Sequence, residues 1–288
     1  VYRMNVLDMI EYHRQLTADV TIATIPADRQ FATEFGVVER MADGRVVRFI
    51  EKDPDAPTIP GAPDKVLASM GNYVFSTEAL LRMLHEDAQD KTSAHDFGKD
   101  VLPRRLDRDR IFAYDFATNR IPGDPANGGS YWRDVGTIDA YFEANMEIRS
   151  SSPPLNLYNR RWPLRTASYP DPPARFEIGS SGAFGEAHDS LVAGGCIIAG
   201  RVRSSVLGRN VQVHEGAVLE ECVILDNCEI GAGTQLRRTI LDKNARLPAG
   251  ERVGFDAERD RQRWHVTDKG VVVVPGTRSP VEVSQIGV

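Results

Sequence analysis

Five short segments in the first half of the chain combine charged, small and aromatic residues in ways that could bind a ligand. They are Phe35-Gly36, Phe49-Ile50-Glu51-Lys52, Leu67-Ala68-Ser69-Met70-Gly71-Asn72-Tyr73-Val74-Phe75, Ser93-Ala94-His95-Asp96-Phe97-Gly98-Lys99-Asp100 and Tyr131-Trp132-Arg133-Asp134-Val135-Gly136-Thr137. Each segment also has a plain structural interpretation. None of them identifies a function by itself.

The residue types of the first three segments do not decide between a role in ligand binding and a structural role. Glu51 and Lys52 close a strand, where charged side chains are usually just solvated. Small residues at Ser69 and Gly71, leading into an aromatic strand, would let a ligand approach the backbone, or would make a tight bend. The pair Phe35-Gly36 has a simple structural interpretation as the bend at the start of a strand.

The last two segments contain carboxylates beside helix starts. Asp96 is expected to cap the helix that follows it, and His95 is expected to be structural. Asp134 precedes Gly-Thr at a junction between a strand and a helix. It would either bind a divalent cation or cap the helix that begins at Ile138.

The elements that position these segments alternate between helices and strands over the first 150 residues. The pattern predicts a helix near 6–16, a strand at 20–25, a hairpin over 36–51 that turns at Asp43-Gly44, and a strand over 68–75. Helices are expected from Thr77 and over 138–148. This alternation indicates a layered α/β domain.

A six-residue period dominates the last third of the chain. Val218, Ile224, Ile230 and Leu236 are six residues apart, Leu247 and Val253 repeat the interval, and Leu191 and Ile197 open the series. The register slips near 240–242, where Ile240 and Leu241 compete for the apolar position. One aliphatic residue per six predicts a parallel β-helix, and the run 270–275 is a candidate cap for its end.

Composition excludes several functional classes. The 288 residues are 41% hydrophobic and 26% charged, which is ordinary for a globular protein. A net charge of −6 without a long basic stripe argues against a nucleic-acid surface, and no apolar run is long enough for a membrane span. Cys196, Cys222 and Cys228 form no metal or disulfide pattern and are expected to be buried thiols in a reducing cytoplasm.

Taken together and in this order, the five segments resemble the motifs of bacterial glucose-1-phosphate adenylyltransferases, a family of sugar nucleotidyltransferases. Residues 156–166 resemble the strap that enters the β-helix of that family, and Tyr2-Arg3-Met4 resembles the end of an upstream motif. The resemblance covers about residues 1 to 275. It implies part of a Rossmann-like nucleotidyltransferase domain over 1–149, a linker over 150–190, and a left-handed β-helix with its cap over 191–288.

The resemblance also implies an activity, which is adenylyl transfer from ATP to glucose 1-phosphate in glycogen biosynthesis, with Mg²⁺ as cofactor. By motif position, Lys52 would contact the sugar phosphate and Glu51 the sugar hydroxyls. Gly36 and Ser69 would line the ADP-glucose pocket, and Asp134 would be a catalytic metal ligand. A cytoplasmic homotetramer regulated by small anionic effectors is also implied, and arginines between 200 and 265 are candidates for binding such effectors.

The same resemblance assigns other functional groups to positions before Val1. These groups are a glycine-rich pyrophosphate loop with its catalytic arginine, the adenine-binding segment and a second metal-binding Asp. We therefore expect this polypeptide to be part of an enzyme and to be inactive alone. Two alternatives remain: a non-catalytic regulatory or assembly paralogue, and a hexapeptide-repeat acyltransferase that uses His214.

Overall fold

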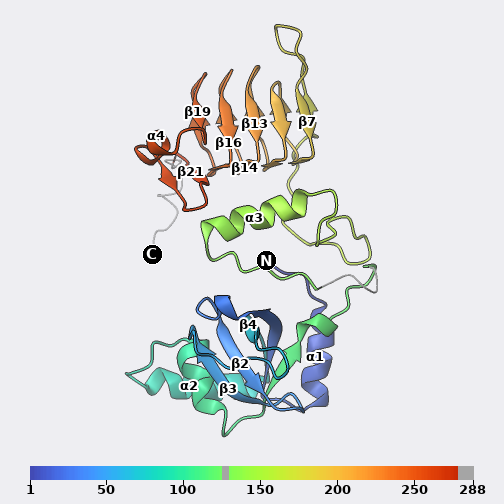
Figure 1. Ribbon diagram of the computed structural model, residues 1–288. Coiled ribbons are helices and arrows are strands. Elements are labelled where there is room, and N and C mark those ends of the chain that lie inside the picture. The colour runs from blue at the N-terminus through green and yellow to red at the C-terminus, as the bar shows by residue number, and fades with distance from the viewer. Residues whose placement is uncertain (125–129, 278–288) are drawn as a thin grey trace. The chain divides into compact units, whose positions relative to one another are not determined.

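The computed structural model describes residues 1–124 and 130–277, and the chain divides into two compact units (Figure 1). Residues 2–132 and 158–163 form the first, which we call the sheet unit. Val1, residues 133–157 and the chain from Leu164 onward form the second, which we call the coil unit. Each unit contains its own hydrophobic core.

A five-stranded mixed sheet in the order β3-β2-β4-β1-β5 organises the sheet unit. Its strands are β1 (Val20–Asp28), β2 (Gly36–Arg40), β3 (Val46–Glu51), β4 (Lys65–Phe75) and β5 (Ile111–Asp115). β1 runs parallel to β5 and antiparallel to β4, and β2 runs antiparallel to both β3 and β4. Because β1 is internal to the sheet, its first five residues are all buried, which explains their unbroken apolar and β-branched run.

Helices and short turns complete the sheet unit. They are α1 (Val6–Gln15), α2 (Thr77–Gln89), η1 (Arg29–Phe31), η2 (Phe97–Val101), η3 (Pro103–Arg105) and η4 (Phe116–Thr118). The predicted hairpin is confirmed, with Gly44 at its turn in the left-handed region at φ +88°. The predicted strand at 20–25 continues through Pro26 to Asp28, because it pairs with β4 along its whole length.

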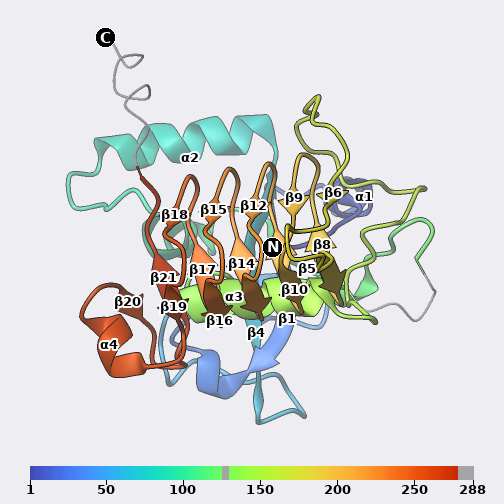
Figure 2. The same ribbon diagram turned by 90° about the horizontal axis from the view of Figure 1, so that it is seen from above.

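Short strands, almost all of them paired in parallel, build the coil unit, and the exception is the antiparallel pairing of the last two. They are β6 (Arg175–Phe176), β7 (Glu186–His188), β8 (Leu191–Val192), β9 (Ile197–Ile198), β10 (Arg201–Arg203), β11 (Val206–Leu207), β12 (Gln212–Val213), β13 (Val218–Glu220), β14 (Val223–Ile224), β15 (Glu229–Ile230), β16 (Gln235–Arg237), β17 (Thr239–Leu241), β18 (Arg246–Leu247), β19 (Arg252–Val253), β20 (His265–Val266) and β21 (Val272–Val274). They form three sheets, ordered β19-β16-β13-β10-β7, β20-β21-β17-β14-β11-β8 and β18-β15-β12-β9-β6. The predicted parallel β-helix is therefore confirmed (Figure 2).

The expected interval of six residues between successive interior positions does not hold throughout, because the coils are shorter than three such intervals. β13 pairs with β16, and Val218 faces Gln235, seventeen residues later. Seventeen residues divide into intervals of six, six and five, so one interval in each coil is shorter. The interior positions are Val202, Leu207, Val213, Leu219, Ile224, Ile230, Leu236, Leu241, Leu247 and Val253, all buried.

Three of the predicted anchors point away from the interior. Ile198, Val192 and Leu219 pack in or against the coil core in place of their predicted neighbours Ile197, Leu191 and Val218. Successive residues in a strand face opposite sides, so two adjacent aliphatic residues cannot be told apart by spacing alone. The competition near 240 is resolved in the same way, since Leu241 is interior and Ile240 packs outside the coils.

The coil stack ends in a cap. Residues 254–271 carry α4 (Ala257–Arg261) and β20, and β21 then returns to pair in parallel with β17. Val272 and Val274 belong to the coil core, so the run 270–275 covers the end of the stack as predicted. Residues 278–288 of the expected β-helix domain lie outside the described residues.

Helix α3 (Ile138–Arg149) packs on the coils (Figure 2) and belongs with them to the coil unit. Phe142 forms a buried cluster with Val223, Ile240 and Val271. Thr267 donates to Asp139 at 2.6 Å, which fixes the same helix from the cap side. The apolar face of α3 therefore belongs to the core of the coil unit.

The cysteines are free and buried, as predicted. All three lie in the coil core, and burial raises the pKa of the Cys222 thiol to about 12. The spacing of Cys222 and Cys228 thus follows from the coil repeat.

Candidate active site

The carboxylate of Glu51 lies in a narrow space between two glycines of the sheet unit, which we call the Glu51 seat. Glu51 ends β3 and pairs in register with Gly36 at the start of β2. A Cβ atom on Gly36 would lie 2.7 Å from Glu51 Oε2, and a Cβ on Gly98 in η2 would lie 2.8 Å from the same oxygen. The carboxylate therefore fits only because both neighbouring residues lack side chains.

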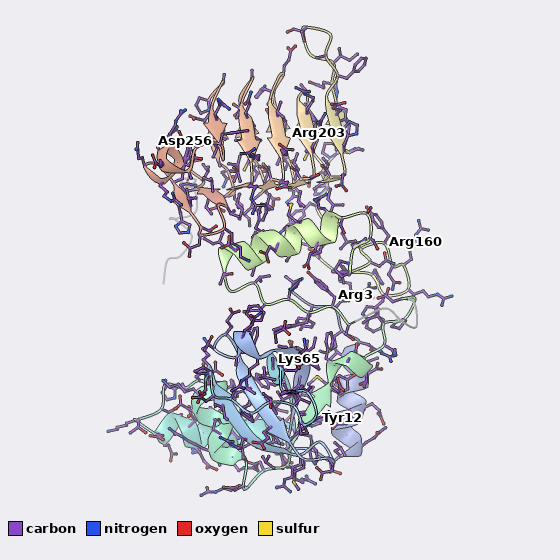
Figure 3. The ribbon with its side chains drawn as sticks, in the orientation of Figure 1. Arg3, Tyr12, Lys65, Arg160, Arg203 and Asp256 are labelled. Atoms are coloured by element: carbon purple, nitrogen blue, oxygen red, sulfur yellow. The ribbon has the colours of Figure 1, made fainter. Side chains whose placement is uncertain are left out.

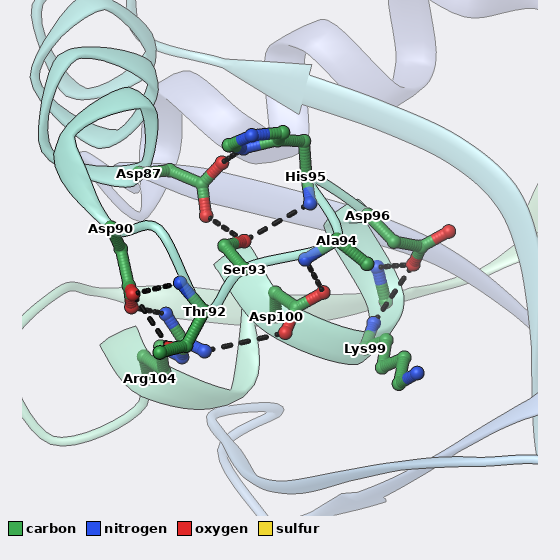
Figure 4. A network of polar contacts seen from close by, with 11 residues as sticks. Asp87, Asp90, Thr92, Ser93, Ala94, His95, Asp96, Lys99, Asp100 and Arg104 are labelled. Carbon is green, nitrogen blue, oxygen red and sulfur yellow. Dashed lines mark hydrogen bonds and ion pairs between the residues drawn. The ribbon is translucent and has the colours of Figure 1, made fainter.

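Burial and a second carboxylate raise the pKa of Glu51. Burial contributes most, and Asp96 adds to it, while Lys52 acts in the opposite direction. Asp96 Oδ1 accepts hydrogen bonds from the backbone N–H groups of Gly98 at 2.8 Å and Lys99 at 2.9 Å (Figure 4). Asp96 is therefore the predicted cap, and it also lies close enough to Glu51 to affect its ionisation.

A bulge in β4 brings Ser69 and Tyr73 together. Ser69 faces Thr24 and Tyr73 faces Ile22, so one residue of β1 is spanned by three of β4. The Ser69 hydroxyl lies near the phenol of Tyr73 and acts to lower its pKa, and Tyr73 also interacts electrostatically with Glu51 and Asp96. Bulges of this kind commonly redirect side chains beside active sites.

Burial raises the pKa of Tyr73, so its phenol stays protonated as a hydrogen-bond donor. Its ring lies 6.1 Å from that of Phe97, which follows Asp96 directly. Within the bulge, the side-chain oxygen of Asn72 is buried and has no partner among the residues described. The bulge thus offers polar atoms beside a stacked aromatic pair.

Lys52 and Trp132 lie near the start of β2, at the same end of the strand as Glu51. The N–H of Lys52 donates to Phe35 O at 3.0 Å, and Lys52 adopts φ +53°, an uncommon conformation for a residue with a side chain. The ring of Trp132 makes an edge contact with that of Phe35 at 5.6 Å. In the described part of the chain, no ion pair or hydrogen bond engages the exposed Lys52 ammonium.

Asp134 belongs to the coil unit, two residues after Trp132 in the chain. It does not cap α3, because Thr137 is the N-cap and accepts from Ala140 N at 3.1 Å. Asp134 Oδ1 accepts from Gly136 N at 3.2 Å. The helix-cap interpretation of Asp134 is therefore wrong, and its exposed carboxylate has no role in ending or starting a helix.

His95 has the structural role expected of it (Figure 4). Its Nδ1 lies 2.7 Å from Asp87 Oδ2, and the Ser93 hydroxyl donates to Asp87 Oδ1 at 2.6 Å. The Ala94 N–H donates to Asp100 at 3.1 Å. These bonds order the loop that presents Asp96 and Phe97.

The structure thus brings Gly36, Glu51, Ser69 and the neighbouring Lys52 into one region of the sheet unit, and adds residues that the sequence interpretation missed. The added residues are Tyr73, Asp96 and Gly98. All three lie within the quoted motifs, but spacing alone did not show that a helix-capping Asp and a glycine face Glu51. His214 on the coils contacts Glu229 at 3.1 Å.

Family models match both parts of the chain. A model described as "Nucleotidyl transferase" matches residues 1–151, and a model described as "GlmU-like, C-terminal hexapeptide" matches residues 172–274. The chain is therefore a nucleotidyltransferase polypeptide joined to a left-handed β-helix of hexapeptide repeats.

Individual relatives show which family of nucleotidyltransferases the chain is similar to. The chain is 49% identical over 278 residues to a glucose-1-phosphate adenylyltransferase of Deinococcus deserti, covering 96% of this chain and 67% of that protein. Identity is 44% to the Anaeromyxobacter protein of that name, with 96% and 68% covered, and 48% to the Thermus thermophilus protein, with 96% and 67% covered. The chain belongs to the glucose-1-phosphate adenylyltransferase family.

Proposed function

We propose that this chain supplies the sugar-phosphate side of the site that transfers an adenylyl group from ATP to glucose 1-phosphate, releasing pyrophosphate and yielding ADP-glucose. The carrying observation is the seat of Glu51 between Gly36 and Gly98, with Tyr73 and Asp96 close by. Sugar recognition requires hydrogen-bonding groups held in fixed positions, and this seat holds a carboxylate in that way.

The reaction mainly requires alignment and charge neutralisation. A phosphate oxygen of glucose 1-phosphate attacks the α-phosphorus of ATP in line, and pyrophosphate leaves. In our proposal Glu51 accepts hydrogen bonds from sugar hydroxyls, Ser69 lines the same pocket, and the Lys52 ammonium neutralises charge on the sugar phosphate. Lys52 suits that role because its ammonium is exposed and adjacent to Glu51.

Magnesium is the cofactor we propose, with Asp134 as a ligand. Asp134 commits one oxygen to the Gly136 N–H and presents a second. Over residues 1–124 and 130–277, no cluster of three Asp, Glu, His or Cys side chains could hold a metal ion. Mg²⁺ commonly uses one or two carboxylates together with substrate phosphates, so a single Asp134 is compatible with it. When bound, the ion would neutralise phosphate charge.

The family also leads us to propose a pathway, a location, an assembly and a form of regulation for this protein. We infer a role in glycogen biosynthesis, a cytoplasmic homotetramer, and regulation by small anionic effectors; no nucleic-acid or membrane partner is proposed. Arg237 and Arg252 both lie over the ring of Phe255, at 4.8 and 4.9 Å, and offer guanidinium groups to such an anion. In the described part of the chain, no helix is both long and apolar enough to cross a bilayer.

The resemblance assigns none of the 288 residues to the triphosphate of ATP, so we expect this polypeptide alone to make no ADP-glucose. Kinetic tests therefore use a catalytically active protein that contains these residues. Retention of Glu51 and Lys52 supports a catalytic protein over a regulatory paralogue.

Replacing Lys52 tests the proposed function. Lys52→Ala should raise the KM for glucose 1-phosphate by about tenfold or more, because a charge-assisted contact to phosphate is lost. The KM for ATP should change far less, since only one phosphate loses its partner. Lys65→Ala is the matched control, because Lys65 is an exposed lysine of the same sheet that pairs with Asp28. Equal effects of Lys52→Ala on both substrates would contradict the assignment.

A further inference from the structure

Gly98 is the one residue outside β2 and β3 whose missing side chain makes room for the Glu51 carboxylate among the described glycines. It lies in η2, two residues after the Asp96 cap, and is buried. An alanine Cβ at this position would lie 2.8 Å from Glu51 Oε2, 3.1 Å from the Phe49 ring and 3.5 Å from Asp96 Oδ1. Real Cβ atoms essentially never approach a neighbour within 3.0 Å, so Glu51 would have to move.

The fold around Gly98 can tolerate that change. Gly98 lies outside the left-handed region, so alanine can adopt its backbone conformation without strain. The closest atom is the end of a flexible side chain, which can rotate away at small cost, and the Phe49 ring at 3.1 Å has to shift by only a few tenths of an ångström. At Gly36 the Cβ would lie closer to that ring, at 2.7 Å, and Phe49 is a core side chain. A substitution at Gly36 would therefore disturb the core as well as Glu51.

We propose that Gly98 is a positioning residue for the sugar-phosphate site, which acts by letting the Glu51 carboxylate lie against the backbone of η2 beside Asp96. The inference rests on the proposed role of Glu51 in binding sugar hydroxyls. Gly98 itself has no side chain to contact substrate, so its whole effect passes through the orientation of Glu51. The two-residue separation from Asp96 couples this position to the cap, because Asp96 Oδ1 binds the Gly98 N–H at 2.8 Å.

The test is a double-mutant cycle of Gly98→Ala and Glu51→Ala, measured in a catalytically active protein that contains these residues. Gly98→Ala alone should raise the KM for glucose 1-phosphate about tenfold, leave the KM for ATP within about twofold, and leave the melting temperature unchanged. In the Glu51→Ala background, Gly98→Ala should add no further change, since the group that it positions is gone.

The outcomes separate the two proposals. If Glu51→Ala leaves the sugar-phosphate KM unchanged, the proposed function of Glu51 is wrong. If Glu51→Ala raises that KM but Gly98→Ala does not, Glu51 binds the sugar and the positioning role of Gly98 is wrong. Additive effects in the double variant would also overturn the inference, because Gly98 would then act through another group. If Gly98→Ala lowers the melting temperature, the cycle is repeated with Gly98→Ser. Additive effects of Gly98→Ser and Glu51→Ala on the KM for glucose 1-phosphate would then overturn the inference.

Discussion

Single residues in the sheet unit show how backbone geometry sets side-chain chemistry. The Asp96 carboxylate is fixed by two backbone N–H groups, while the half-buried Glu51 is placed beside it. Burial raises the pKa of Glu51, and the nearby Asp96 carboxylate adds to this shift.

This shift predicts a pH dependence of sugar-phosphate binding. Glu51 accepts hydrogen bonds best when ionised, and its pKa lies above the ordinary 4.5. Affinity for glucose 1-phosphate should therefore rise as pH increases through this raised pKa. Calorimetric titrations at several pH values would measure it, and Glu51→Gln should remove this component while leaving the titration of the phosphate itself. An unchanged pH profile in Glu51→Gln would contradict the role of Glu51.

Asp134 provides a second prediction at this scale. Thr137 caps α3, so Asp134→Asn should leave the melting temperature nearly unchanged, with the Gly136 N–H still bonded to the remaining oxygen. If Asp134 ligates Mg²⁺, loss of its charge should lower kcat by about tenfold or more, and higher Mg²⁺ should partly restore it. Thr137→Ala is the control, because it should cost about 1 kcal/mol of stability without a magnesium effect. Normal turnover of Asp134→Asn would rule out the metal role.

At the scale of elements, the coil unit depends on residues that tolerate sharp corners. Asn210, Asn227 and Asn244 all adopt positive φ, and their amides form a ladder with 3.3 Å hydrogen bonds from each to the next. Asparagine accepts the left-handed conformation more readily than most residues. The ladder therefore turns the chain and joins neighbouring coils at the same position.

A hairpin over residues 178–184 is held to the coils by one carboxylate. Glu215 accepts from Ser180 N, the Ser180 hydroxyl and Ser181 N at 2.6 to 2.9 Å. These hydrogen bonds lower the pKa of Glu215 from 4.5 to about 2. Because the folded pKa lies below the unfolded one, this stabilisation is fully present above pH 4.5 and is lost as pH falls toward 2.

We therefore predict that Glu215→Ala speeds amide hydrogen exchange at Ser180 and Ser181 at neutral pH without unfolding the coils. In the parent protein the same two amides should lose protection as pH falls below about 4.5, whereas the variant should show no such step. Glu220→Ala on β13 serves as the control, since Glu220 is an exposed carboxylate away from the hairpin. Equal exchange in Glu215→Ala and the parent would show that the hairpin is held by other contacts.

At the scale of the whole molecule, the coil unit includes α3 through its packing core. Phe142 is 2% exposed and contacts the outside of the coils, and Lys269 pairs with Glu143 at 2.7 Å. Exposing that apolar cluster by removing α3 should cost several kcal/mol. The coil unit should therefore be a stable fragment only when α3 is retained.

This predicts different behaviour of two fragments. A fragment of residues 133–277 should unfold cooperatively and resist protease, whereas a fragment of 150–277 should melt at a lower temperature. Phe142→Ala in the longer fragment should lower its stability by about 3 to 5 kcal/mol, measured by denaturant unfolding. Equal melting temperatures for the two fragments would show that the coils need no contribution from α3.

The sequence alone determined the local features of this protein. The hairpin at Asp43-Gly44, the cap at Asp96, the coiled repeat and the family motifs all depend on residues close together in the chain. Turn chemistry, caps and repeats are short-range, because each coil packs only on its neighbours. These predictions therefore needed no knowledge of distant contacts.

Only the tertiary structure decided how separate segments meet. Spacing could not choose between Val218 and Leu219, because a one-residue shift in register moves a side chain to the opposite face. Nor could it show that Gly98 lies against Glu51, forty-seven positions earlier, since that contact depends on how η2 packs on the end of β3. The site at Glu51 is formed by long-range packing, which periodicity and local propensity do not encode.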